Sequence, residues 1–517
     1  MPRLVQLLVK PKSRGKSLPE ITSFRLYQDL HTHHCFEIEV PFDMLETNAT
    51  EFMSRSHQEL VGKPIAISIE EDTLTGALHK FRFRGIVTSL VMSSSNDYTG
   101  SFIIKGHSPT CLLTDGVQKR TFRNKTLADI VAQVLQPYPS NEDLVNVLKG
   151  TLVHTALVPY VVQYQESNFD FLNRLLATYR EWFYFDGTQL CIGQPPAEPE
   201  VSLFMDGYWS NFQVEAAIRP ANTSLYAYDA TRHKHLTGVS GDASGTVATN
   251  PYAQFAVKTS QDVFTQTSHF LAPIAVQSTS DLTEAAKNVG AANAAGALNF
   301  RGRTDNPNLR LGQLIDASAE GLGSTVTRTD NVGKYRIISL THEVDEEGNY
   351  QNYFVAVPHA LTLPPGNPYA TVPPAQPELA EVVDVKDPKK LGRLRVRYYW
   401  AQARPADAES DWIRVTTPYS GDGKGQLFVP EVGSQVLVAY EHNRPDMPVV
   451  LGNLFHANNK QKASYSPTGN AVKGIQTASG NKITFHDKAG EEKILISSGK
   501  KRAPSWKFPL PRMAPLP

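Results

Sequence analysis

The chain has 517 residues, of which 41% are apolar and 20% charged, enough for about three or four globular domains with sizeable cores. Lys plus Arg and Asp plus Glu are equal at 51 each, and this zero formal net charge argues against a nucleic acid as the main partner. Cys35, Cys111 and Cys191 are too few and too far apart for a disulfide framework or a CxxC metal motif.

The first residues do not resemble a secretion signal. The apolar run from Leu4 to Val9 is shorter than a signal-peptide core, and no small-residue cleavage site follows it. No stretch of about 18 apolar residues occurs in the sequence, so we expect no transmembrane helix. Export, if it occurs, is expected to proceed without a cleaved signal.

Short alternating segments, separated by clusters of Gly, Asn, Asp and Ser, predict mainly β-structure. In the N-terminal part these segments are Phe36–Val40, Ile65–Ile69, Phe81–Arg84 and Phe102–Ile104. Helical periodicity occurs in Leu127–Leu135 (after a possible N-cap at Thr126), in Phe169–Tyr179 and in about Leu282–Leu298. We therefore expect a mainly β fold with a few helices.

Seven prolines between residues 358 and 377 mark the clearest boundary in the sequence. Proline fixes φ and removes a backbone donor, so residues 358–377 should form a stiff, extended linker after an N-terminal module of residues 1–357. Six short strands are predicted within residues 378–457, which suits a small closed barrel of the OB type. They are Ala380–Val385, Arg393–Trp400, Trp412–Tyr419, Gln426–Pro430, Gln435–Tyr440 and Val449–Phe455.

The last part of the chain has a different character. Residues 458–498 hold three very short predicted strands, which are too few to bury a core without disulfides, metals or oligomerisation. Residues 499–517 form a basic, proline-rich tail that we expect to be disordered or extended.

Motifs for catalysis or cofactor binding are incomplete. A phosphate-binding loop ending at Gly15 requires a glycine where Lys10 stands, and Ala243 occupies the serine position of a GxSxG-like stretch. The segment His31–Cys35 has metal-ligand residue types, but a polar loop leading into the next strand is the better interpretation. The aromatic segment Tyr179–Phe185 is interpreted as a helix end and a buried strand, since no basic patch flanks it for nucleic-acid stacking. We expect no catalytic, cofactor-binding or metal site.

Four segments, in a fixed order, carry a family resemblance. They are Gly106–Pro109 with Leu127–Val131, then Gln163–Leu176, then Gly392–Val396 through Gly452, and finally Gly474–Thr477 with Ser479–Asn481. Together they resemble the VgrG (valine–glycine repeat) family of contractile injection systems over nearly the whole chain. In the second segment Asn168 replaces the aspartate that usually follows the serine.

This resemblance implies a phage-hub-like N-terminal half of two β-barrel-like subdomains with helical inserts, an OB-fold barrel, and the start of a trimeric β-helix needle. The implied function is a structural spike and baseplate hub that punctures a target membrane on sheath contraction and carries effectors or a tip protein. Implied partners are two further copies of the chain, an Hcp-like inner-tube protein, baseplate proteins and a PAAR-type tip protein. The protein would lie in the cytoplasm in the assembled apparatus and then be translocated. The type of apparatus (type VI, phage or extracellular particle) stays open.

A trimer would solve the packing problem of residues 458–498. Three chains winding their strands around one axis would cover each other's edges and bury their apolar side chains together, which a monomer cannot do. The predicted trimer core consists of Ile475, Ile483, Phe485, Ile494 and Ile496.

Two other functions are alternatives to the spike. One is a baseplate hub with a cell-wall hydrolase role, which is disfavoured because no lysozyme-like insertion fits between Phe455 and Gly474 and the tail is short for a toxin domain. The other is an OB-type ligand-binding protein, for which monomeric behaviour and salt-sensitive ligand binding would be the signature. We expect the chain not to be an enzyme.

Overall fold

The computed structural model describes residues 3–45, 54–72, 78–93, 100–138, 147–195, 199–207, 210–220, 222–241, 251–273, 278–320, 329–359, 363–460, 469–499 and 505–509. The chain forms two compact units. The larger comprises Met1–Ala375, Trp400–Asp411 and His442–Met447, and the smaller comprises Gln376–Tyr399, Trp412–Glu441 and Pro448–Pro517. Two segments that follow the proline-rich stretch in sequence thus belong to the larger unit.

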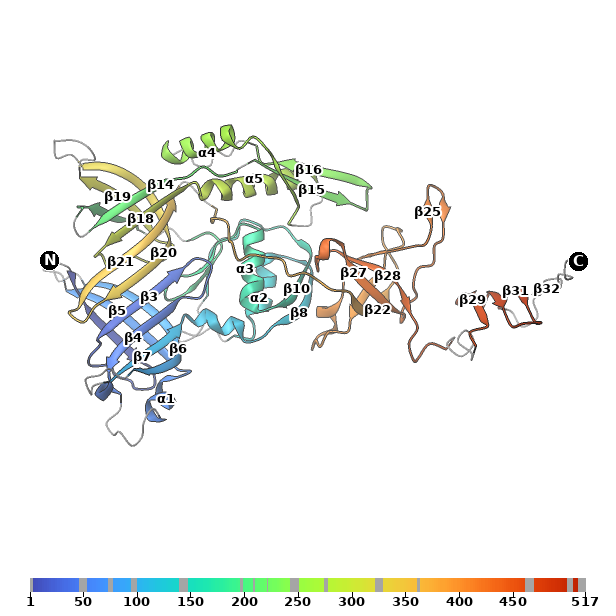
Figure 1. The fold of residues 1–517 in the computed structure, drawn as a ribbon, viewed down its shortest axis with the longest axis horizontal. Helices are drawn as coiled ribbons and strands as arrows, with labels where there is room; N and C mark the ends of the chain where they lie inside the picture. Colours follow the sequence, from blue (N-terminus) through green and yellow to red (C-terminus); the bar gives the residue numbers. More distant parts are fainter. Residues whose placement is uncertain are drawn as a thin grey trace, which may run out of the picture. The chain divides into compact units, whose positions relative to one another are not determined.

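Among the described residues, the larger unit is built on a sheet of thirteen strands, ordered β14-β18-β21-β20-β3-β4-β7-β6-β5-β2 with β1, β13 and β19 attached beside this path. Strands β3 and β20 pair antiparallel and join its two halves, as Figure 1 shows. The strands are β1 (Arg3–Leu4), β2 (Gln6–Pro11), β3 (Ser23–Asp29), β4 (Cys35–Pro41), β5 (Pro64–Asp72), β6 (Leu78–Ser93), β7 (Ser101–His107), β13 (Val201–Met205), β14 (Asn211–Ala216), β18 (Leu298–Thr304), β19 (Leu314–Glu320), β20 (Thr329–Val344) and β21 (Asn349–Pro358).

The apolar and polar residues that alternate in the sequence are alternately buried and exposed in these strands. In β4, Phe36, Ile38 and Val40 are buried while Cys35 and Glu37 are exposed, because successive side chains point to opposite faces. All four predicted N-terminal segments lie within β4, β5, β6 and β7, and the prediction of a mainly β fold is confirmed. Each half of the sheet covers its own hydrophobic core.

The helices follow the predicted pattern in three places. Helix α2 (Leu127–Leu135) begins after Thr126, whose side chain accepts a hydrogen bond from the Asp129 amide while the Asp129 carboxylate accepts one from the Thr126 amide. Helix α3 (Asn168–Thr178) has Ser167 as its N-cap. Helix α5 (Thr279–Ala295) ends before Leu298, which was predicted to be helical but opens β18 instead, where Leu298 and Phe300 are both buried and Asn299 between them is half-buried.

Other short elements complete the described helices. Helices α1 (Ser54–Leu60) and α4 (Pro251–Val263) were not predicted, and no described helix has both the length and the apolarity needed to cross a membrane. The 3-10 turns are η1 (Phe42–Met44), η3 (Pro109–Thr114), η5 (Pro405–Ala408) and η6 (Glu441–Asn443).

Smaller sheets surround the large one within the same unit. Strand β8 (Gln118–Lys125) pairs with β10 (Val158–Glu166), and β9 (Val147–Lys149), β11 (Phe183–Phe185) and β12 (Leu190–Ile192) form a second small sheet. A third has β15 (Thr223–Asp229) between β16 (Lys234–Val239) and β17 (Ser268–Leu271). Helix α5 runs along β15 and β16 (Figure 1) and buries Leu282 and Ala286 against Leu225 and Leu236.

The smaller unit contains a five-stranded sheet ordered β23-β22-β27-β28-β24 in its described part. Its strands are β22 (Glu378–Asp384), β23 (Arg395–Tyr398), β24 (Arg414–Val415), β27 (Gln435–Tyr440) and β28 (Pro448–Leu454), and a ribbon of β25 (Ser420–Gly421) and β26 (Lys424–Gly425) lies apart from it in the pairing. The strand predicted at Gln426–Pro430 is wrong, and only β24 remains of Trp412–Tyr419. Apolar residues made residues 426–430 look like a strand, yet Leu427 and Phe428 are exposed and the segment pairs with no described strand.

The C-terminal segment forms a second sheet, ordered β29-β30-β31-β32. Its strands are β29 (Val472–Gln476), β30 (Lys482–His486), β31 (Lys493–Ser497) and β32 (Ser505–Pro509). The tail was predicted to be disordered or extended, and its residues 505–509 form an extended strand that pairs antiparallel with β31, a pairing that was not predicted. The reason lies in the alternation of Trp506 and Phe508 with polar residues, which the tail's basic and proline-rich composition obscured. Residues 510–517 of the tail lie outside the described residues.

Candidate functional site

The antiparallel register of the C-terminal sheet brings the five predicted core residues onto one face. Ile475 lies opposite Ile483, and Ile483 lies opposite Ile496. Phe485 lies opposite Ile494 in the neighbouring row. Because directly opposed residues share a face, these five side chains form one patch, which we call the apolar face.

Strand β32 continues the sheet beside β31. In the backbone register, Trp506 is opposite Ile496 and Phe508 is opposite Ile494. Sequence reasoning missed these two positions because it predicted no strand in the tail. The signal that could have found them is the period-2 pattern Ser505-Trp506-Lys507-Phe508.

The apolar face is not covered by the described part of the chain. The exposed fractions are 46% for Ile475, 40% for Ile483, 42% for Phe485 and 42% for Ile496. Full burial of a large apolar side chain stabilises a protein by about 1.5–3 kcal/mol relative to exposure, so each of these residues has roughly 1 kcal/mol still to gain. A contiguous exposed patch of this kind is typical of an interface.

Tight turns fix the register of this sheet. Gly480 has a φ of +87°, and its amide donates to the Thr477 carbonyl at 2.8 Å. Gly499 passes so close to Ser479 that an added Cβ would lie 1.9 Å from the Ser479 carbonyl oxygen, and its amide donates to the Asn481 side chain at 3.2 Å. Larger residues at Gly480 or Gly499 would shift the strands and with them the apolar face.

A second group of exposed apolar side chains lies in the OB-type part of the smaller unit. Leu427 is 80% exposed and Phe428 is 61% exposed, in the segment that was predicted to be a buried strand. Tyr419, Val432 and Phe455 are also more than half exposed. These residues are candidates for the same kind of contact as the apolar face.

In the larger unit, the segment Gln163–Leu176 is held by a buried ion pair. The Arg174 guanidinium donates to both carboxylate oxygens of Glu166, at 2.6 and 2.7 Å, and to the Val162 carbonyl at 2.9 Å. Between these partners Gln165 has a φ of +52°, at a shift in the pairing register of β10. The ion pair therefore stabilises the bulge that ends β10 and starts α3.

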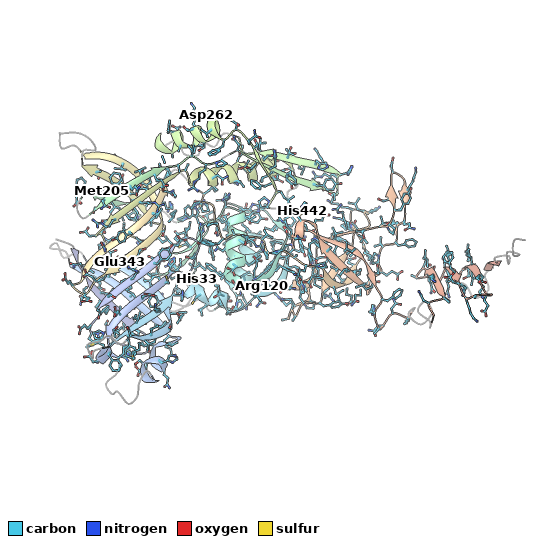
Figure 2. The ribbon with its side chains drawn as sticks, in the orientation of Figure 1. His33, Arg120, Met205, Asp262, Glu343 and His442 are labelled. Atoms are coloured by element: carbon cyan, nitrogen blue, oxygen red, sulfur yellow. The ribbon has the colours of Figure 1, made fainter. Side chains whose placement is uncertain are left out.

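Asn168, which replaces the usual aspartate of the family, uses both its side-chain oxygen and its side-chain nitrogen in hydrogen bonds. Its side-chain oxygen accepts from Arg120 at 2.5 Å and from Gln163 at 3.2 Å, and its nitrogen donates to the Tyr138 hydroxyl at 2.8 Å. Arg120, labelled in Figure 2, comes from β8 and also donates to the Gln163 side chain at 2.7 Å. An amide suits this position because it must accept and donate at once.

The segment Gly106–Pro109, the first of the four that carry the family resemblance, is closely packed. A Cβ at Gly106 would lie 2.2 Å from the Ile86 carbonyl oxygen and 2.3 Å from the Phe36 ring. The Ser108 hydroxyl accepts from the His34 amide at 3.1 Å, and the Ser108 amide donates to the His34 carbonyl at 2.9 Å. Gly106 and Ser108 thus hold β7 against β4 and the loop that precedes it.

Residues 31–34 form the predicted loop before the next strand, and Cys35 is the first residue of β4. His34 is fully buried, with one ring nitrogen 3.1 Å from the Gln28 amide and the other 3.2 Å from the Asp29 carbonyl, and burial lowers its pKa to about 3. His33, labelled in Figure 2, is hydrogen-bonded to Thr110. In the described ranges no three His, Cys, Asp or Glu side chains are grouped so as to hold a metal ion.

The part of the aromatic segment that forms the predicted strand is also buried as interpreted. Trp182 to Phe185 are all buried, and β11 pairs with β12. They therefore offer no platform for stacking bases. The GxSxG-like stretch around Ala243 lies outside the described residues.

Two family models match the chain. A model of the phage tail baseplate hub (GPD) matches residues 34–348, which is more than half of the chain. The chain belongs to the phage tail baseplate hub family. A model of the type VI secretion system/phage-baseplate injector OB domain matches residues 378–455.

Curated relatives of this hub protein confirm the VgrG resemblance. The type VI secretion system spike protein VgrG1c of Pseudomonas aeruginosa is 22% identical over 474 residues, covering 84% of this chain and 62% of the relative. The spike protein VgrG1b of the same organism is 23% identical over 488 residues, covering 85% of this chain and 61% of the relative. The chain thus spans about three fifths of the length of these two relatives.

Solved structures share the fold of the hub protein. The E. coli c3393 protein, described as a type VI secretion component similar to the bacteriophage T4 tail proteins gp27 and gp5, matches with a TM-score of 0.55 and 17% identity. That match covers 86% of this chain and all but 1% of the other. A chain of the lidless PdpA–VgrG complex matches with a TM-score of 0.56 and 10% identity over 96% of both chains.

Proposed function

We propose that this protein is the spike-and-hub subunit of a contractile injection apparatus and acts as a homotrimer. The larger unit would serve as the baseplate hub, the OB-type barrel as a collar, and the C-terminal sheet as the start of the needle. The observation that carries the proposal is the apolar face, where Ile475, Ile483, Phe485, Ile494 and Ile496 are aligned on one side of the sheet.

Three copies would bury their apolar faces against one another around a common axis. In the described residues β29 pairs only with β30, and β32 only with β31, so both edges of the sheet can also accept a strand of another copy. A cyclic trimer with head-to-tail contacts uses both features. Its backbone groups would be paired between chains, which makes a stiff rod suited to puncturing a membrane.

The role we propose is mechanical and not catalytic. Contraction of a surrounding sheath would supply the work, and the spike would leave the cytoplasm with the inner tube. Because the relatives are named type VI spike proteins, a type VI apparatus is the favoured setting. Its partners would be an Hcp-like tube protein and baseplate proteins on the hub, with effectors or a PAAR-type tip protein on the needle, and its contact with the target membrane would be transient.

The solution mass of the purified chain tests this proposal. Light scattering should give about three times the 57.1 kDa of one chain. A clean monomer at micromolar concentration would contradict the proposal, because the apolar face would then have no partner. A second test is delivery: the protein should reach the culture medium in cells with an intact sheath gene and stay in the cytoplasm in cells without it.

A further inference from the structure

The larger unit contains a groove of about 710 Å³, whose lining does not include Arg174 or Glu166. Its walls are the end of α3, the segment 154–159 and one side of α5. Helix α5 turns Leu282 and Ala286 toward the small sheet and presents Asp281, Glu284 and Asn288 to the groove, as the helical spacing requires. The groove is large enough to take a side chain and the peptide units around it.

Arg180 lines this groove and has no anionic partner. Its side chain makes no hydrogen bond or ion pair within the described part of the chain. Burial lowers the pKa of its guanidinium to about 10, with no neighbouring carboxylate to offset the lost hydration. Arg174, less than two helical turns earlier, shows how a buried arginine is usually neutralised. Its Nε and one Nη atom both donate to the Glu166 carboxylate. A largely buried arginine that has no carboxylate partner can bind an anion from another molecule.

The surroundings of Arg180 select the kind of anion. Tyr179, Leu157 and Val289 give the groove an apolar lining, and the Leu157 side chain is 58% exposed. The His154 ring packs on Tyr179 with centroids 4.4 Å apart, and its buried Nε2 has no hydrogen-bond partner. Burial lowers the pKa of His154, so the ring is neutral and can bond to a peptide group.

The facing wall limits the charge of the ligand. Asp281 and Glu284 lie on α5 across the groove, and their carboxylates would repel a multiply charged phosphate. A ligand with a single carboxylate beside an apolar side chain matches the wall with Arg180 and its apolar neighbours. Its peptide N–H groups can then face the carboxylates of α5. We propose that this groove binds a partner-protein segment through a carboxylate held by Arg180, with an adjacent apolar side chain against Tyr179 and Leu157.

Two small probes test the proposal on the full chain. Saturation-transfer NMR with N-acetyl-L-leucinate should give a signal, and the neutral N-acetyl-L-leucinamide should give a signal at least tenfold weaker. Arg180→Gln should abolish binding of the carboxylate, and Glu284→Gln should strengthen it severalfold by removing the opposing charge. Arg25→Gln is the matched control, because Arg25 pairs with Glu343 in another part of the unit and its loss should change nothing.

Three results would overturn the proposal. They are equal binding of the two probes, no binding of the carboxylate by the native chain, and unchanged binding after Arg180→Gln. If Arg180→Gln fails to fold, Arg180→Lys and Glu284→Gln decide: the first should retain weakened binding and the second should still strengthen it. A fall in solution mass with Arg180→Gln would assign the groove to a second copy of this chain and overturn the partner assignment, whereas an unchanged mass leaves the proposed spike function untouched.

Discussion

Ile483 of β30 lies directly opposite Ile496 of β31, and the two side chains, on one face of the C-terminal sheet, are 40% and 42% exposed. Neighbouring apolar side chains normally shield each other from water, so this pair marks a surface made to be covered. The first prediction concerns this pair, because a charge at either position would have to be buried in the proposed trimer.

Ile483→Asp should prevent trimer formation. Three unpaired carboxylates would be buried around one axis, and each costs several kcal/mol or must take up a proton. Light scattering should give the mass of a monomer. Lys482→Asp is the matched control, because Lys482 points to the opposite face and its variant should remain trimeric. A trimeric Ile483→Asp protein would contradict the assignment of the apolar face.

Removal of residues 500–517 should loosen the C-terminal sheet. Strand β32 covers one edge of β31 through the pairs from Lys493–Pro509 to Ser497–Ser505, and its loss exposes that edge to water. Amide hydrogen exchange in residues 493–497 should become at least tenfold faster, while exchange in β4 should not change. Equal protection of β31 in both proteins would show that β32 adds nothing to the sheet in solution.

Arg174→Met should destabilise the larger unit by about 3–5 kcal/mol, since it leaves the buried Glu166 carboxylate without its partner. Urea denaturation followed by tryptophan fluorescence measures the loss. The control is Arg25→Gln, which removes the ion pair of a 67% exposed arginine with Glu343 and should cost less than about 1 kcal/mol. Similar losses for both variants would rule out a special role for the buried pair.

Asn168→Asp should be tolerated, with a change in stability below about 1 kcal/mol. The carboxylate can still accept from Arg120 and Gln163, and the Tyr138 hydroxyl can donate to it by giving up its exposed hydrogen bond to the Asp115 carboxylate. Asn168→Leu should instead cost about 2–3 kcal/mol, because it leaves buried donors without acceptors. Thermal unfolding of the two variants checks this, and an equal loss for both would contradict the hydrogen-bond account.

The stability contributed by Asp387 should depend on pH. Hydrogen bonds from Arg393, together with the amides of Lys389, Leu391 and Arg393, hold the pKa of the Asp387 carboxyl well below its usual range. A depressed folded-state pKa stabilises the protein above the unfolded-state value of about 3.9, and this contribution is lost as the pH falls further.

Asp387→Asn should therefore lower the melting temperature of the smaller unit at pH 7, and the difference from the native protein should shrink as the pH is lowered below about 4. Calorimetry between pH 7 and pH 3 measures it. Asp422→Asn, in an exposed turn, is the matched control. A melting difference that stays constant down to pH 3 would show that the charge of Asp387 is not the cause.

The sequence predicted helices and strands well where a local pattern, such as an N-cap or a period-2 alternation, is enough to define the element. Helical periodicity after the N-cap Thr126 placed α2 to the residue, and period-2 alternation located β4 and β7. It failed where the pattern was ambiguous, as in the segment 426–430, whose apolar residues face water and not a barrel interior. Leu298 shows the same limit, since a buried residue at a helix end and one at a strand start look alike in sequence.

By itself the sequence determined the β-rich class of this protein, its caps and turns, its family and the identity of the apolar residues in the last strands, because these depend on neighbours a few positions apart. Only the tertiary structure decided that Trp506 and Phe508 stand opposite Ile496 and Ile494 in the backbone register, and that Arg180 has no carboxylate partner among the described residues while Arg174 pairs with Glu166. Strand register and the pairing of buried charges depend on which distant segments the fold brings within a few ångströms of each other, and no local pattern encodes that distance.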